Sequence, residues 1–188
     1  MTRVFTFIFV LMLSGYQTAY ALELAELLQN ISSTPEKFAL FTEAKMAYFL
    51  EKPLISKGYM EFKSPSTMIK RMTEPEMMEQ TIEGDVLSIY QGEQRRKTQS
   101  LSANSKLALG INAVRWVLSG DHEMLETNFQ AIVNGDLNSW TIQLSPKDLE
   151  LKEKIKLMLI TGADQNIQQI LIEQPNGNSI KTDLYEHR

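Results

Sequence analysis

The sequence predicts an α+β protein in which a few short helices accompany a large antiparallel sheet. Between residues 54 and 100, and again between 129 and 185, short segments alternate apolar and polar side chains and are separated by turn residues. That pattern is typical of antiparallel strands joined by hairpins. Two other stretches, one near residue 25 and one at Asn104–Leu118, space their apolar residues as helices do.

The first 21 residues carry the pattern of a secretory signal peptide. Arg3 precedes an apolar run at Val4–Leu13, and a polar stretch leads to the small-x-small site Ala19-Tyr20-Ala21. An apolar run of about ten residues is too short to span a bilayer, which needs about 20. We therefore expect cleavage after Ala21 rather than an uncleaved anchor or a buried first helix. Residues 22–188 then form one exported domain, and a Gram-negative periplasm is the expected compartment.

The composition excludes several classes of protein. The chain has 188 residues, no Cys, 19 Lys+Arg and 23 Asp+Glu. Arg3 is the only charged residue before the cleavage site, so the exported part carries 18 basic against 23 acidic side chains, a net charge of −5. This balance argues against nucleic acid as a partner and against electrostatic attachment to anionic membranes. The lack of Cys excludes thiol catalysis and a lipidated Cys, and we expect a monomer held together by its core alone.

Two helices are expected at the start of the exported part. Leu22–Ile31 has amphipathic spacing. Thr34 and Pro35 match the cap and the first position of a second helix, which Pro53 would follow. The apolar residues expected on one side of that second helix are Phe38, Phe41, Met46, Phe49 and Leu50.

The apolar period changes to two after Leu54. Alternating residues indicate four strands, around Met60, Met68, Met78 and Leu87, and the polar segment Gln94–Ser100 reads as a fifth. Turn residues separate these strands at Ser64-Pro65, Glu74-Pro75, Gly84-Asp85 and Gly92-Glu93.

An unusually apolar helix is expected at Asn104–Leu118, where Lys106, Asn112 and Arg115 are the clearly polar residues. We expect His122–Asn128 to be a connector and Pro146–Lys154 a short helix or turn. The remaining expected strands are Phe129–Asn134, Leu137–Leu144, Lys156–Thr161, Asn166–Glu173 and Ser179–Tyr185, the last two joined by a hairpin turn at residues 175–178.

Motifs for catalysis or metal binding are missing from the sequence. The chain has two histidines, His122 and His187, and His122 lies near Glu123 and Glu126. Without a third strong ligand, a solvated connector is the favoured interpretation. No nucleophile elbow, P-loop, dinucleotide fingerprint or His-Glu-x-x-His occurs. We therefore expect no metal, no cofactor and no enzymatic activity.

Methionine is the unusual feature of the expected sheet. Eight methionines follow Ala21, and five of them fall on the first three strands: Met60, Met68, Met72, Met77 and Met78. Methionine is flexible and polarisable, and it suits surfaces that accommodate irregular ligands. These residues are either ordinary core under a helix or the lining of a cavity covered by Asn104–Leu118. If the turn at Pro65 preserves the strand register, strand parity would place six residues on that inward face, namely Met60, Phe62, Ser64, Met68, Lys70 and Met72.

Three segments in order resemble the LolA-type periplasmic carriers of lipoproteins. They are Gly58-Tyr59-Met60-Glu61-Phe62-Lys63-Ser64-Pro65, Met72-Thr73-Glu74-Pro75 and Glu83-Gly84-Asp85-Val86-Leu87-Ser88-Ile89-Tyr90. The family shows Gly-x-apolar-x-apolar-x-Arg-Pro, a Pro about ten residues later, and Asp-Gly-x-x-apolar-x-x-Tyr. The resemblance implies an incomplete antiparallel β-barrel, its mouth covered by helices, around a cavity for acyl chains.

The sequence departs from the family in three places. Ser64 replaces the Arg that ties the covering helices to the barrel, and Met68 replaces an aromatic residue. The chain ends soon after Ser179–Tyr185, without the family's further Phe-x-Phe-x-x-Pro segment. These departures indicate a divergent branch, whose cargo is a lipoprotein, a free lipid or another acyl product.

The resemblance implies a periplasmic carrier that moves acyl chains from an inner-membrane donor complex toward an outer-membrane acceptor. The alternatives are a periplasmic sensor or interaction domain of the same fold, and an enzyme of lipid metabolism. Ser64 and Lys70 are expected to contact the covering helices or a lipid head group, unless Lys70 extends to the rim. The residues expected to bind lipid are Met60, Phe62, Met68, Met72, Leu87, Ile89, Leu107, Ile111, Val114, Trp116 and Trp140.

Overall fold

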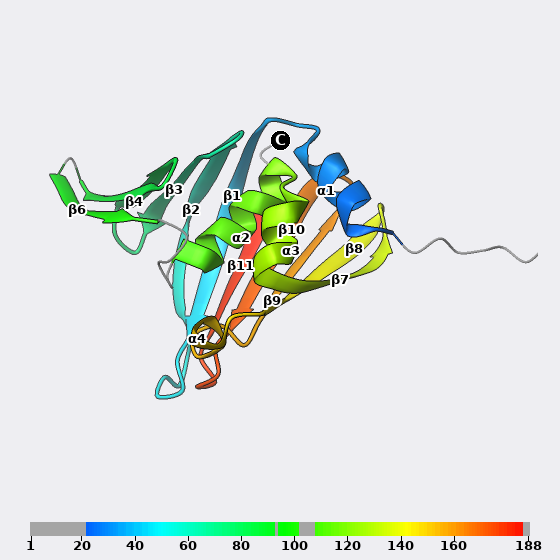
Figure 1. Ribbon diagram of the computed structural model, residues 1–188. Coiled ribbons are helices and arrows are strands. Elements are labelled where there is room, and N and C mark those ends of the chain that lie inside the picture. Colours follow the sequence, from blue (N-terminus) through cyan, green and yellow to red (C-terminus); the bar gives the residue numbers. More distant parts are fainter. Residues whose placement is uncertain (1–21, 93, 102–107, 186–188) are drawn as a thin grey trace, which may run out of the picture.

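The computed structural model describes residues 22–92, 94–101 and 108–185, which form an α+β fold around one curved, unclosed sheet (Figure 1). Eleven strands in this part of the chain join antiparallel, in the order β6-β5-β4-β3-β2-β1-β11-β10-β9-β8-β7. Helices α1, α2 and α3 lie over one face of the sheet. The predicted α+β class and the incomplete barrel with covering helices are confirmed.

The strands are β1 (Glu36–Met46), β2 (Leu54–Lys63), β3 (Thr67–Glu74), β4 (Met78–Glu83), β5 (Val86–Gln91), β6 (Gln94–Ser100), β7 (Phe129–Asp136), β8 (Ser139–Pro146), β9 (Leu157–Ala163), β10 (Asn166–Glu173) and β11 (Ser179–Tyr185). The helices are α1 (Leu24–Ser32), α2 (Ala108–Ser119), α3 (His122–Asn128) and α4 (Leu149–Lys152). No helix in the described ranges is both long and apolar enough to cross a membrane.

One face of the sheet, called here the inner face, packs under the helices. Phe62 of β2 lies opposite Met68 of β3, which lies opposite Ile82 of β4, which lies opposite Leu87 of β5. All four side chains are buried in the core. The next inner row pairs Met60 with Lys70. Cross-strand neighbours share a face, so Met60, Phe62, Met68 and Lys70 lie on one face, as strand parity predicted for these four residues.

The helices complete the core above this face. Leu27, Leu28 and Ile31 of α1 are fully buried. Val117 of α2 and Leu125 of α3 are also fully buried, and all five belong to one cluster with the inner face of the sheet. The predicted helix at Leu22–Ile31 is confirmed as α1. The described part of the predicted Asn104–Leu118 helix is α2, and residues 104–107 lie outside the described residues.

The helix predicted after Thr34 is wrong, because this segment is the strand β1 at the centre of the sheet. It pairs with β2 along one edge and with β11 along the other. As a central strand it carries apolar residues on both faces: Phe41 is buried on the inner face, whereas Phe38 and Leu40 point outward. Apolar residues on two faces blur the period of two, so their spacing resembled that of a helix.

The connector predicted at His122–Asn128 is wrong as well. The segment is helix α3, which begins after Asp121. The Asp121 Oδ1 atom accepts a hydrogen bond of 3.1 Å from the backbone N–H of Met124, an N-cap that satisfies one free donor of the first turn. Leu125 anchors the helix in the core. With only one buried residue in seven, the helix has too weak an apolar period to predict from sequence.

Candidate binding pocket

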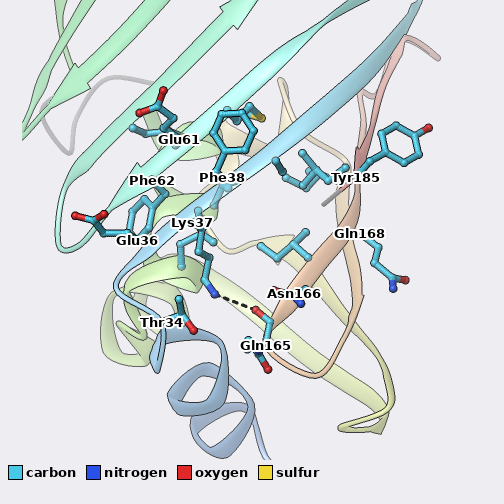
Figure 2. Close-up of a pocket in the computed structure, with 18 of the residues that line it drawn as sticks. Thr34, Glu36, Lys37, Phe38, Glu61, Phe62, Gln165, Asn166, Gln168 and Tyr185 are labelled. Atoms are coloured by element: carbon cyan, nitrogen blue, oxygen red, sulfur yellow. Dashed lines mark hydrogen bonds between the residues drawn. The ribbon is translucent and has the colours of Figure 1, made fainter. Parts of the chain in front are cut away.

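A pocket of about 740 Å³ lies between the helices and the end of the sheet where β1 begins and β2 ends. Figure 2 shows its lining residues, which come from strands on both sides of β1 and from the β9–β10 turn. The volume falls within the range of about 300–1,000 Å³ that is typical of small-molecule sites. The sheet joins its first strand, β1, to its last, β11, at this place, so the pocket depends on contacts between segments far apart in the sequence.

The interior wall of the pocket is apolar. The sheet side contributes eight such residues and α2 contributes Val114 and Leu118. The residues from the sheet side are Ala39, Met60, Phe62, Met68, Ala163, Ile167, Ile170 and Leu184. Phe38 also lines the pocket, but it faces outward and is exposed. A wall of this kind offers burial to apolar groups and no hydrogen bonds from side chains, so it suits hydrocarbon.

Polar groups gather at the mouth. Thr34, Glu36 and Asp164 are exposed there. The Lys37 ammonium donates a hydrogen bond of 3.1 Å to the backbone carbonyl of Gln165, which links β1 to the β9–β10 turn across the mouth (Figure 2). An apolar interior with a polar rim fits an amphiphile whose apolar part enters and whose polar part stays at the surface.

Four of the residues predicted to bind lipid line this pocket: Met60, Phe62, Met68 and Val114. Phe62 and Met68 are also core residues, with exposed fractions of 3% and 6%. The sequence left open whether such residues are core or cavity lining, and for Phe62 and Met68 both are true. These two side chains pack in the core and close the pocket at the same time.

Other predicted lining residues belong to the core. Leu87 is buried among core residues, and Ile89, Ile111 and Trp116 pack against the same cluster. Trp140 is 1% exposed, and its indole Nε1–H donates a hydrogen bond of 2.9 Å to the carbonyl of Asp164. None of these five lines the pocket. Leu107 lies outside the described residues.

Ser64 and Lys70 do not come together. Ser64 lies in the exposed β2–β3 turn, where its backbone N–H donates to the carbonyl of Pro35. Lys70 lies on the inner face, and its ammonium forms an ion pair with Glu43 of β1. Strand parity linked the two positions, but the turn breaks the strand before residue 64. The Lys70 charge is compensated by a carboxylate, and no contact to the covering helices is needed to explain it.

Two polar residues of α2, Asn112 and Arg115, bond to each other. Asn112 is buried, and its Oδ1 accepts a hydrogen bond of 3.0 Å from Arg115. Burial lowers the pKa of the Arg115 guanidinium, and the carboxylate of Asp85 opposes that shift. Neither residue lines the pocket, so α2 turns an apolar side toward it.

His122, Glu123 and Glu126 fall on α3. Nowhere in the described residues do three or more His, Cys, Asp or Glu side chains gather as a metal ion would require. His187 lies outside the described residues.

Sequence reasoning missed the contributions of β1, β10 and β11 to the pocket. Ala39 was assigned to a helix. Ile167, Ile170 and Leu184 were placed on two strands joined by a hairpin, with no indication that these strands lie beside residues 36–46. Their alternation could be read from the sequence. The pairing of Leu40 with Tyr185, which brings the two groups together, could not.

The class of protein is thus defined by its fold: a curved antiparallel sheet that holds a pocket with an apolar wall against covering helices. The chain belongs to the outer membrane lipoprotein carrier protein LolA-like family, whose model matches residues 17–185.

Two solved structures share the fold. A DUF1329 family protein from Desulfovibrio piger ATCC 29098 is 11% identical, with a TM-score of 0.50 over 87% of this chain and 89% of that one. A domain from Vibrio parahaemolyticus, proposed to be an outer membrane lipoprotein-sorting protein domain, is 8% identical, with a TM-score of 0.50 over 89% and 91%. At such identities the likeness concerns the fold alone. No curated protein matches the sequence.

Proposed function

We propose that the protein is a periplasmic carrier that holds the acyl chains of a lipoprotein or lipid in this pocket and takes them from the inner membrane toward the outer membrane. The observation that carries the proposal is the pocket of about 740 Å³, apolar inside and polar at its rim. Family membership and the predicted signal peptide support the same interpretation.

The chemistry of the wall suits reversible transfer. Each methylene group that leaves water gains about 0.8 kcal/mol, in a bilayer as in an apolar pocket. Movement between the two is therefore nearly isoenergetic, and the carrier must avoid packing its cargo too tightly. Met60 and Met68 offer flexible, polarisable surface that adapts to a chain without a single fixed fit.

A pocket-filling substitution tests the proposal. Ala39 lines the pocket, so Ala39→Phe would occupy part of its volume, whereas Ala44→Phe adds the same ring to the outer face of the same strand. Protein purified from the periplasm would be extracted with organic solvent and analysed by mass spectrometry. We expect acyl lipid in the wild type and in Ala44→Phe, and at least about tenfold less in Ala39→Phe, since filling the site removes the burial that binds the chain.

Absence of acyl lipid from folded wild-type protein, together with no uptake from vesicles, would contradict the proposal. Equal lipid content in the Ala39→Phe and Ala44→Phe variants would place the lipid elsewhere on the protein. Lipid that is bound but never delivered to acceptor vesicles would favour the sensor domain over the carrier.

A further inference from the structure

A charged network lies on the inner face beside the pocket. The Lys70 ammonium contacts the Glu43 carboxylate, and their side chains are only 19% and 13% exposed. Thr182 of β11 donates a hydrogen bond of 3.2 Å to the same Glu43 oxygen. The ammonium also lies 4.9 Å from the centre of the Phe41 ring. These four residues form a compact group on three strands, in which the Phe41 ring lies beside the polar side chains of Lys70, Glu43 and Thr182.

The strand register places this group directly below the pocket. On β1 the next inner-face residue after the lining Ala39 is Phe41, and Glu43 follows it. On β3 the next after Met68 is Lys70, and on β11 the next inward from Leu184 is Thr182. Between them, β2 presents Gly58, which has no side chain. The group thus lies one or two inner-face positions beyond the lining residues of these strands, on the side away from Lys37 and Gln165. None of its four residues lines the pocket itself.

The inner face becomes apolar again below the group. Met72 follows Lys70 on β3, Ile180 precedes Thr182 on β11, and Ile172 lies opposite Ile180 on β10. Met72 is an inward residue that does not line the pocket. The charged network therefore separates the pocket from a second apolar stretch of the same face.

We propose that the Lys70–Glu43 pair, held by Thr182 and Phe41, forms a barrier just beyond the pocket lining, called here the floor, and sets the length of acyl chain that the pocket accepts. The inference rests on the proposed function, because it supposes that hydrocarbon occupies the pocket. A chain that reaches the pair must either stop or separate two largely buried charges, which costs free energy. A longer chain leaves its additional methylenes outside.

Chain-length selectivity gives the test. Each methylene that the pocket buries raises affinity about fourfold. Affinity measured by displacement of a fluorescent fatty acid should therefore rise steeply along a series of saturated fatty acids and then level off at the floor. Glu43→Leu/Lys70→Met replaces the pair with apolar side chains of similar size, an exchange that proteins often tolerate. In this double variant we expect affinity to keep rising to longer chain lengths before it levels off. Short chains should bind with the wild-type affinity.

A matched control pair exists on the neighbouring strands β2 and β3. Lys57 and Glu74 form an exposed ion pair of 3.2 Å across β2 and β3, with side chains 53% and 63% exposed. Lys57→Met/Glu74→Leu makes the same chemical change without touching the floor, and we expect the wild-type chain-length profile. If the floor variant does not fold, Glu43→Gln/Lys70→Met tests the same point, since Gln keeps an acceptor for Thr182.

The outcomes separate the two proposals. An identical levelling point in the wild type and in a folded floor variant overturns the chain-length role and leaves the carrier proposal standing. Wild-type protein that binds no fatty acid of any length overturns the carrier proposal and this inference with it. A shift to longer chains in the floor variant alone supports both.

Discussion

At Gly58 the backbones of β2 and β3 approach too closely for a side chain. An added Cβ would lie 1.9 Å from the carbonyl oxygen of Arg71 and 3.0 Å from the Cα of Met72. Backbone cannot move aside as a flexible side chain does. We expect Gly58→Ala to lower the free energy of unfolding by roughly 1–3 kcal/mol or more, measured by urea denaturation.

Gly110 of α2 provides the control for that substitution. Among the described residues, a Cβ there would meet the side-chain Cδ1 of Ile155 alone, at 3.2 Å. Alanine is also favoured over glycine in a helix interior by about 1 kcal/mol. Gly110→Ala should therefore leave stability unchanged or raise it slightly. Equal losses from the two substitutions would show that the close approach at Gly58 is not the cause.

For these strands, the sequence predicted the face of the sheet on which a side chain lies, but not whether that side chain lines the pocket. Alternation placed Met60, Lys70 and Met72 on the inner face, and the register agrees. Only Met60 lines the pocket, because the Lys70–Glu43 pair lies between the pocket and Met72. Glu43 could not be named from sequence, since its segment was assigned to a helix.

The same limit applies to Trp140. Its size and apolar pattern suited a cavity wall, yet it lies in the core against Gly162. A Cβ on that glycine would come within 2.3 Å of the indole ring. The contact joins neighbouring strands β8 and β9, and nothing in the local pattern of either strand indicates that a ring fills the space above a glycine.

Among whole elements, the short helix α3 depends on its cap. Asp121 accepts from the Met124 N–H, and the helix has seven residues and one buried side chain. Loss of the cap leaves that donor without its side-chain partner. We expect Asp121→Ala to lower the free energy of unfolding by about 1 kcal/mol, within a range of roughly 0.5–2 kcal/mol, as measured by thermal and urea unfolding.

Glu126→Ala, on the same helix, removes a carboxylate outside the cap and should change stability by less than about 0.5 kcal/mol. A loss as large as that of Asp121→Ala would refute the capping role. A folded α3 matters to the site, because Leu125 belongs to the core on which α1 and α2 also pack.

Elements with a clean period were predicted correctly and those without one were not. Strands β2 to β5 each carry alternating side chains bounded by turn residues, and the turns lie where they were expected. Strand β1 has neighbours on both edges and apolar residues on both faces, and it was taken for a helix. Its pairing with β2 and β11 makes this segment a strand, and a local sequence pattern carries no information about such long-range pairing.

For the molecule as a whole, the decisive contact joins the two series of hairpins. Strands β1 to β6 and β7 to β11 follow one another as neighbours within each series. The sequence suggested the hairpins of the first series only from β2 onward, because β1 was predicted to be a helix. The seam between β1 and β11 pairs Leu40 with Tyr185. The pocket is built at this seam, so its existence followed from family resemblance, while its particular lining required the structure.

Export is the prediction that concerns the whole chain. The apolar run before Ala21 and the Ala19-Tyr20-Ala21 site predict a cut that leaves Leu22 at the N-terminus. Leu22 and Leu24 already pack against the core, so this cut removes no residue of the described fold. N-terminal sequencing of protein from the periplasmic fraction should read Leu22-Glu23-Leu24. Ala21→Tyr places a bulky residue where the cleavage site needs a small one, and the uncut precursor should accumulate. A periplasmic protein that begins at Met1, or cleavage unaffected by Ala21→Tyr, would refute the assigned site.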